Sequence, residues 1–293
     1  MPVDRGGAYL AACTIYRDDA AYLAEWIEFH RLMGVERFFL YDNGSTDHHR
    51  EVLADYLAEG VATLQEWAAP FLGHNGRPKA IVTAFEHCVG THRQDARWIA
   101  FLDVDEFLFA PDGLPLPEVL NEYEEFPGVV VNRAEFGPAG HVTKPEGLVI
   151  ESYIQRRPLR PDDESAHKSI VDPSRVARCL GAHSFMYVDG QPVDEQKRPV
   201  DMMRRMRRKP VTWARLRAHH YWSRSEEERR SKAELWSEVG SPLSDPAAPA
   251  TGPSAGHPRL LGDAEAVDRA HSVRDDSLAR YGPAVREVLA RRG

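Results

Sequence analysis

This sequence has few cysteines, no long apolar run and no excess of positive charge. The chain of 293 residues contains 3 cysteines, which lie far apart and form no CxxC pair. This argues against a disulfide framework or a zinc knuckle and favours a reducing cytoplasm. No apolar run approaches the roughly 18 residues of a membrane span, and residues 1–7 lack the apolar core of a signal peptide. We expect a cytoplasmic protein, soluble or peripheral at the inner face of the membrane.

The charge balance does not favour a nucleic-acid binder. Lys and Arg number 37 against 45 Asp and Glu, which gives a net charge of −8, and such an acidic excess opposes general binding to a phosphate backbone. A hydrophobic fraction of 42% with 28% charged residues is typical of a globular protein and excludes wholesale disorder. At roughly 150 residues per domain, the chain can form one large domain or two small ones.

Short apolar segments alternate with helical patterns over the first hundred residues. The segments with the composition of buried strands are residues 8–14, 37–41, 61–67 and 98–102. Strands separated by helices predict right-handed βαβ units and a mainly parallel sheet. Ligands of such sheets bind beyond the carboxyl ends of the strands. The polar segments that should gather at this edge are 16–19, 42–47 and 103–106.

The second half of the chain is less regular. Its composition predicts a helix over 116–126 and strands over 129–133, 148–154 and 168–171. We expect one α/β domain over 1–235, a flexible linker rich in Pro, Ala, Ser and Gly over 236–262, and a C-terminal helical tail over 263–293. Residues 197–217 carry 9 basic side chains. The basic run 204–209 within them predicts a solvated helix face or a patch for acidic lipid headgroups or an anionic glycan, and the segment 197–217 could contact the membrane surface.

Asp103 and Asp105 directly follow the fourth predicted strand. Alternate residues of a strand point the same way, so both carboxylates can reach one cation where the strand ends. Carboxylate oxygens suit Mg²⁺ or Mn²⁺. An isolated DxD pattern is usually only a pair of solvated acids, but its place in an alternating domain favours a metal site. Because two neighbouring carboxylates repel each other, we expect Asp105→Asn to leave the stability of the fold nearly unchanged.

Several blocks of sequence, in order, resemble glycosyltransferase family 92, a DUF23-like group related to the family 2 glycosyltransferases of GT-A fold. The blocks are CTIYRDD at 13–19, the helical segment 25–30, YDNGSTD at 41–47, WIAFLDVDEF at 98–107, FGPAGH at 136–141, GLVIE at 147–151, KSIV at 168–171, AHSF at 182–185 and HYWSRSEE at 220–227. The resemblance covers about residues 8–235. Several ordered blocks are far more specific than the DxD pattern alone.

The resemblance implies a GT-A fold, with a mixed, mainly parallel α/β sheet flanked by helices, to which the tail over 263–293 adds a C-terminal helical extension. It also implies transfer of a sugar from a nucleotide-sugar donor, UDP- or GDP-linked, to a hydroxyl of a glycan, lipid or small molecule. Asp103 and Asp105, with His183 as a third ligand, would hold Mn²⁺ or Mg²⁺ on the donor diphosphate. A lone histidine such as His183 is otherwise more often structural.

Further residues are assigned to the donor by the same resemblance. They are Thr14, Tyr16 and Arg17 beside the base and ribose, Asp42 facing the nucleoside, and Lys168 facing the diphosphate. Two of these residues have a plainer interpretation. Asp42 opens an Asp-Asn-Gly-Ser sequence that is typical of a turn, and lysines such as Lys168 usually lie on the solvated surface.

Inverting transfer, which the resemblance also implies, requires a carboxylate base on the acceptor side of the sugar. Glu151 is our first candidate because a family block contains it, and Asp163 and Glu135 are alternatives downstream of the glycine loop. Glu151 could instead be an exposed strand residue that pairs with Arg156 or Arg157 and contributes little.

Two functions other than sugar transfer are compatible with a DxD pattern or with this fold. Phosphatases of the haloacid dehalogenase type have a DxDxT pattern near the first strand of their core. Here Phe107 stands where that pattern has threonine, and three βα units precede the DxD pattern. The fit is poor. A catalytically inactive GT-A protein that binds a glycan or a nucleotide stays open as an alternative, although the intact Asp103 and Asp105 favour an enzyme.

Overall fold

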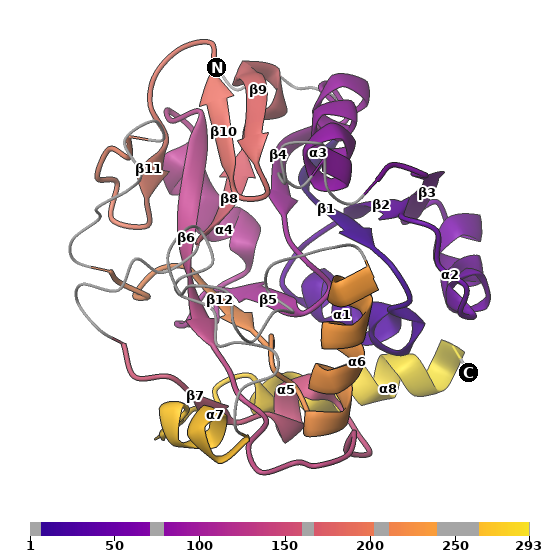
Figure 1. The fold of residues 1–293 in the computed structure, drawn as a ribbon. Helices are drawn as coiled ribbons and strands as arrows, with labels where there is room; N and C mark the ends of the chain where they lie inside the picture. The colour runs from indigo at the N-terminus through magenta and orange to yellow at the C-terminus, as the bar shows by residue number, and fades with distance from the viewer. Residues whose placement is uncertain (1–6, 71–78, 160–166, 202–210, 239–263, 293) are drawn as a thin grey trace.

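A computed structural model gives the fold of this chain (Figure 1). The structure describes residues 7–70, 79–159, 167–201, 211–238 and 264–292. Asp163, most of the expected linker and the centre of the basic segment 197–217 lie outside the described residues.

One nine-stranded sheet forms the centre of the described structure, in the order β3-β2-β1-β4-β8-β6-β12-β5, with β11 paired to β6. Its parallel half consists of β1 (Ala8–Tyr16), β2 (Arg37–Asp42), β3 (Ala62–Glu66) and β4 (Ala96–Phe101). The other half consists of β5 (Glu106–Phe109), β6 (Gly128–Glu135), β8 (His167–Val171), β11 (Val193–Asp194) and β12 (Arg217–His220). Antiparallel pairing occurs where β8 meets β4 and β6 and where β12 meets β5. The expected mixed, mainly parallel α/β sheet is confirmed.

Helices cover both faces of the parallel half. The helices of the described chain are α1 (Ala20–Leu32), α2 (His49–Ala58), α3 (Lys79–Thr91), α4 (Leu116–Leu120), α5 (Val149–Ser152), α6 (Glu226–Glu238), α7 (Ala264–Ala270) and α8 (Gly282–Arg292). Alternate residues of β1 point to opposite faces. Leu10 and Ala12 pack into the cluster that contains α1 and α2, whereas Ala11 and Cys13 pack with α3.

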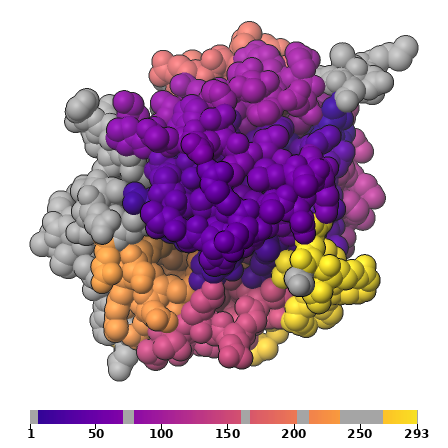
Figure 2. Space-filling model, turned by 90° about the vertical axis from the view of Figure 1, so that its right-hand side faces the viewer, coloured from indigo at the N-terminus to yellow at the C-terminus, as the bar shows by residue number. Residues whose placement is uncertain are grey.

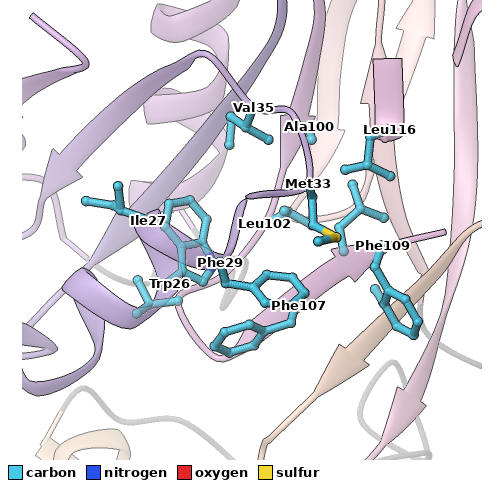
Figure 3. Close-up of a cluster of buried hydrophobic side chains, with 14 of the residues drawn as sticks. Trp26, Ile27, Phe29, Met33, Val35, Ala100, Leu102, Phe107, Phe109 and Leu116 are labelled. Carbon is cyan, nitrogen blue, oxygen red and sulfur yellow. The ribbon is translucent and has the colours of Figure 1, made fainter. Parts of the chain in front are cut away.

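The first helix shows why the sequence forms this layer. Trp26, Ile27 and Phe29 of α1 are fully buried and meet Phe107 of β5 in the main core (Figure 3). Burial of each such side chain stabilises the fold by about 2 kcal/mol or more. The helix ends where Gly34 adopts φ +97°, a conformation that glycine adopts readily and other residues rarely do.

The prediction of a strand over 148–154 is wrong. Residues 149–152 form α5, and only Gln155–Arg156 form the short strand β7. The carboxylate of Glu25 accepts the backbone N–H groups of Val149 and Ile150 at 2.9 and 3.1 Å. A carboxylate at a helix N-terminus satisfies donors that would otherwise be orphaned. This partner lies 124 residues away in the sequence, so the local pattern could not reveal it.

Two short antiparallel pairs complete the described strands. Strand β9 (Val176–Gly181) pairs with β10 (Ser184–Tyr187), and β7 pairs with β13 (Val273–Arg274). The β13 pairing ties the C-terminal residues to the domain, and α8 lies beside α1 (Figure 1). Arg292 at the end of α8 contacts Glu28 of α1 at 2.8 Å.

The side view shows the same arrangement in space. The C-terminal helix α8 and helix α6 lie below the N-terminal half, on either side of the region that contains α5 (Figure 2). Among the described helices, none is both long and apolar enough to cross a membrane.

Candidate functional site

The polar segments that follow β1 and β2 meet, as the sheet topology predicts. Asp18 donates its N–H to the hydroxyl of Ser45 at 2.9 Å and accepts the N–H of Thr46 at 2.6 Å. The carboxylate of Asp47 accepts the N–H of Ala20, the first residue of α1, at 2.8 Å. The two strand ends therefore form one hydrogen-bonded edge.

Asp42 lies at this edge and stabilises a turn. Its carboxylate is buried and accepts the N–H of Ser45 at 2.8 Å, which is the usual role of Asp in a turn. Its other oxygen lies 3.7 Å from Nε2 of His49. Its assignment to the nucleoside stays a prediction.

The three other predicted nucleoside residues differ in exposure. Thr14 and Tyr16 are buried, and their hydroxyls have no hydrogen-bond partner within the described part of the chain. Burial raises the pKa of the Tyr16 phenol above its usual value. Arg17 is 40% exposed and lies 3.6 Å from Asp18. Of the three, only the Arg17 side chain is open to a ligand in this arrangement.

Asp103 lies in the turn after β4 and binds a buried lysine. Nζ of Lys168 lies 2.7 Å from Oδ2 of Asp103 and 2.8 Å from Oε2 of Glu106. The register of β8 against β4 pairs Ser169 with Phe101, which brings Lys168 beside the end of β4. Burial disfavours the charge on Lys168, but the two carboxylates outweigh it and raise the pKa of this lysine. Lys168 is thus held as a fixed cation next to Asp103.

Asp105 binds a different lysine, at the other end of the turn. Nζ of Lys232, which α6 contributes, lies 2.6 Å from Oδ2 of Asp105, and Nε2 of His220 lies 3.5 Å from Oδ1. Burial disfavours the carboxylate, yet Lys232 and His220 hold the pKa of Asp105 well below its usual range. Asp105 is therefore ionised at every physiological pH.

A continuous series of buried charges links these two aspartates. Arg133 of β6 contacts Glu106 at 2.8 Å and Glu135 at 3.1 Å, and Glu135 contacts Nδ1 of His220 at 2.6 Å. We call this set the ion network; in order, its members are Asp103, Lys168, Glu106, Arg133, Glu135, His220, Asp105 and Lys232.

His220 lies between two carboxylates of the ion network, Glu135 and Asp105. Burial and Arg133 lower its pKa, but Glu135 and Asp105 prevail and raise the pKa of His220 above 6.5. The register of β12 places His220 opposite both Glu106 of β5 and Glu135 of β6. Two neighbouring strands therefore hold the imidazole in place.

The donor set suits a hard divalent cation only in part. The carboxylates of Asp103 and Asp105 are the oxygen ligands that Mg²⁺ and Mn²⁺ prefer. However, no group of three or more His, Cys, Asp or Glu side chains within the described residues is arranged to hold a metal ion. His183 lies between β9 and β10, where its carbonyl accepts the hydroxyl of Ser169 at 2.7 Å. His220 is the histidine that contacts Asp105, and His183 as a metal ligand stays a prediction.

The structure gives the surroundings of two of the three candidate bases. Glu151 lies on α5 and binds Arg286 of α8, so its partner is neither of the arginines we considered. Glu135 belongs to the ion network, and Asp163 lies outside the described residues. A further carboxylate is Asp19, 3.9 Å from Arg224, where burial raises its pKa to about 6.

Sequence reasoning assigned no role to three members of the ion network, namely Glu106, Arg133 and Lys232. Glu106 adjoins the DxD pattern, and Arg133 follows Val129–Val131 in an apolar strand. A charge inside a buried strand must be paired, so Arg133 carried a usable signal. Lys232 is four residues beyond Glu228 on a strongly charged helix, so nothing in the sequence set it apart from its charged neighbours.

Comparison with known proteins identifies the family. A sequence profile of glycosyltransferase family 92 matches residues 9–237, and the chain belongs to that family. A family 92 protein of Oryza sativa subsp. japonica is 33% identical over 186 residues, which cover 62% of this chain and 30% of that protein. A galactan β-1,4-galactosyltransferase of Arabidopsis thaliana is 28% identical over 109 residues, 36% of this chain and 21% of that protein. The chain matches about a third or less of each of these relatives.

Solved structures with a weak likeness to this chain include S. aureus TarS and a mycobacterial protein. S. aureus TarS 1–349 in complex with UDP-GlcNAc has a TM-score of 0.40 at 11% identity, covering 79% of this chain and 65% of that one. A mycobacterial protein has a TM-score of 0.37 at 15% identity, and the match covers 87% of this chain and 83% of that one.

Proposed function

We propose that this chain transfers a sugar from a nucleotide-sugar donor to a hydroxyl of an acceptor. Membership of glycosyltransferase family 92 supports the reaction class. The observation that supports this site is the pairing of Asp103 with Lys168 and of Asp105 with Lys232 where strands end. The galactan β-1,4-galactosyltransferase among the relatives makes a glycan acceptor a reasonable first choice.

The chemistry of the reaction explains why such charges belong together. Loss of a nucleoside diphosphate builds negative charge on the β-phosphate, and fixed cations in a dry site stabilise it. Lys168 is a fixed cation of this kind, because two carboxylates hold it and it is fully buried. Asp103 and Asp105 would hold Mn²⁺ or Mg²⁺, which when bound neutralises phosphate charge.

The finer assignments are part of the same proposal. Thr14, Tyr16, Arg17 and Asp42 would surround the nucleoside. Transfer would be inverting, with a carboxylate base that removes the acceptor proton. Glu151 could serve as this base only after leaving Arg286, to which it is bound; Asp163 and Glu135 are the other candidates.

We propose that the protein works in the cytoplasm, where nucleotide sugars would serve as its donors, with peripheral contact to the membrane through residues 197–217. Binding to vesicles with and without anionic lipid would test this contact.

The function can be tested with a donor panel. The protein is incubated with Mn²⁺ and UDP- or GDP-sugars, and release of the nucleoside diphosphate is measured with and without galactan oligosaccharides. We expect release with one donor, loss of release with EDTA, and loss in Asp105→Asn. Binding of nucleotide or glycan without release in any combination would instead indicate an inactive binding protein, and release of phosphate from a phosphomonoester would indicate a phosphatase.

A further inference from the structure

The two lysines of the ion network are held in different ways. Lys168 is fully buried and contacts two carboxylates, Asp103 and Glu106. Lys232 is 27% exposed and, within the described part of the chain, contacts one carboxylate, Asp105, at 2.6 Å. Its ammonium also lies over the ring of Trp222, 3.8 Å from the centroid. One lysine is therefore fixed, whereas the other lies at the solvent edge of the site.

The helix that carries Lys232 is anchored at its start. Ser225 and Glu228 form a reciprocal capping box, in which the Ser225 hydroxyl accepts the N–H of Glu228 and the Glu228 carboxylate accepts the N–H of Ser225. Glu228 also accepts the hydroxyl of Tyr153 at 2.6 Å. Lys232 lies one helical turn after Glu228, on the same face of α6. The helix start is thus fixed, and the long lysine stem carries the freedom to move.

We infer that Lys232 is a placeholder cation, which leaves Asp105 when a metal–diphosphate complex binds there and then contacts the phosphate oxygens of that incoming complex. This inference rests on the proposed function, because it assumes that Asp103 and Asp105 hold the metal of a nucleotide-sugar donor. It assigns to α6 a diphosphate-binding residue that follows the last family block in the sequence.

The exchange follows from elementary electrostatics. The ammonium of Lys232 lies 2.6 Å from Oδ2 of Asp105, where it would repel a divalent cation held by the same carboxylate, so a metal that arrives alone would compete with Lys232 for Asp105. A metal that arrives with a diphosphate brings new acceptors, and the flexible four-carbon stem of lysine can follow them. Lys232 therefore opposes binding of the bare metal and favours binding of the metal–nucleotide complex.

Two variants of α6 separate this role from a general effect of charge. Lys232→Met removes the placeholder. Arg230→Met removes a cation from the same helix at a site that is 65% exposed and contacts only Glu226 among the described acids, so it changes the net charge equally. Lys232→Arg keeps the charge. Thermal melting checks that every variant is folded.

The test compares the bare metal with the metal–nucleotide complex. Free Mn²⁺ is measured by electron paramagnetic resonance during titration with Mn²⁺ alone, and UDP and GDP are each titrated calorimetrically with Mn²⁺ present. For Lys232→Met we expect Mn²⁺ alone to bind about tenfold more tightly and the nucleotide–Mn²⁺ complex about tenfold more weakly, each about 1.4 kcal/mol. Arg230→Met and Lys232→Arg should stay within about twofold of the wild type, because neither removes the cation at Asp105.

Opposite shifts in the two affinities support the inference, since a purely structural role would move both in one direction. If the wild type binds Mn²⁺ and loses it in Asp105→Asn, but Lys232→Met leaves both affinities unchanged or weakens both, the inference is overturned and the proposed metal site stands. If neither the wild type nor Lys232→Met binds Mn²⁺ with or without nucleotide, the metal site of the proposed function fails and the inference fails with it.

Discussion

Replacing Asp105 with asparagine should destabilise the fold, contrary to the expectation from sequence. Two adjacent aspartates suggested repulsion, but Asp105 is surrounded by cations, with Lys232 at 2.6 Å and His220 at 3.5 Å. Breaking a fully buried ion pair costs about 3–5 kcal/mol. Because Lys232 is 27% exposed, water screens part of its attraction to Asp105. We therefore expect Asp105→Asn to lower the free energy of unfolding by about 2 kcal/mol.

The stability lost in Asp105→Asn depends on pH, because both Asp105 and His220 titrate. The pKa of Asp105 is lowered by folding, so its contribution is present above about pH 4 and is lost only as the pH falls through the folded value. The pKa of His220 is raised by folding, so its contribution is complete below about pH 6.5 and is lost as the pH rises through the folded value. The variant should therefore lose more stability at pH 6 than at pH 9.

Urea unfolding followed by circular dichroism at both pH values measures this effect. A loss of about 2 kcal/mol corresponds to a fall of roughly 5 °C in Tm for a domain of this size. Asp112→Asn is the matched control, because Asp112 forms an ion pair with Arg215 at 2.9 Å but is 37% exposed, and exposed pairs contribute about 0–1 kcal/mol. A loss below about 0.5 kcal/mol in Asp105→Asn at pH 6 would refute the reasoning.

Three further changes test other parts of the structure. Lys168→Met leaves the buried Glu106 short of a cation and should lower the free energy of unfolding in urea by about 3 kcal/mol. Gly137→Ala places a Cβ 2.6 Å from Nδ1 of His271 and should lower Tm by roughly 4 °C through overpacking. A protease site inserted between residues 245 and 255 should, once cut, leave residues 264–292 bound in gel filtration, because β13 pairs with β7.

The two substitutions have matched controls, and the cut chain has an outcome that would contradict the prediction. Lys79→Met removes an exposed lysine from α3 and should leave the unfolding free energy unchanged within about 0.5 kcal/mol. Gly181→Ala adds a methyl group in open space and should leave Tm unchanged. Elution of residues 264–292 apart from the domain in buffer would show that the C-terminal contacts do not hold the two pieces together.

The parallel half of the fold could be predicted because its signals are local. The apolar runs of β1 and β4 and the apolar spacing of α1 are visible within single windows of sequence. Gly34 marks the end of α1 in the sequence and has the left-handed conformation in the structure. The meeting of the β1 and β2 strand ends then follows from topology alone.

The region around α5 could not be predicted, because its determinant is distant. The apolar sequence of 148–154 fits a buried strand as well as a short helix. Helix α5 forms with its first N–H groups on Glu25. Burial raises the pKa of Glu25 to about 7, although the two N–H groups oppose this rise. A helix of four residues depends on such tertiary contacts.

The ion network is an intermediate case, in which the sequence could show that partners exist but not which they are. Lys232 lies 127 residues from Asp105, and Arg133 lies 27 residues from Glu106. No local pattern connects residues so far apart. An arginine inside an apolar strand is nevertheless a signal, because an unpaired buried charge would cost more than the fold can tolerate. Arg133 therefore predicts a buried carboxylate, and only the strand order identifies it as Glu106, the residue through which Arg133 is joined to the DxD turn.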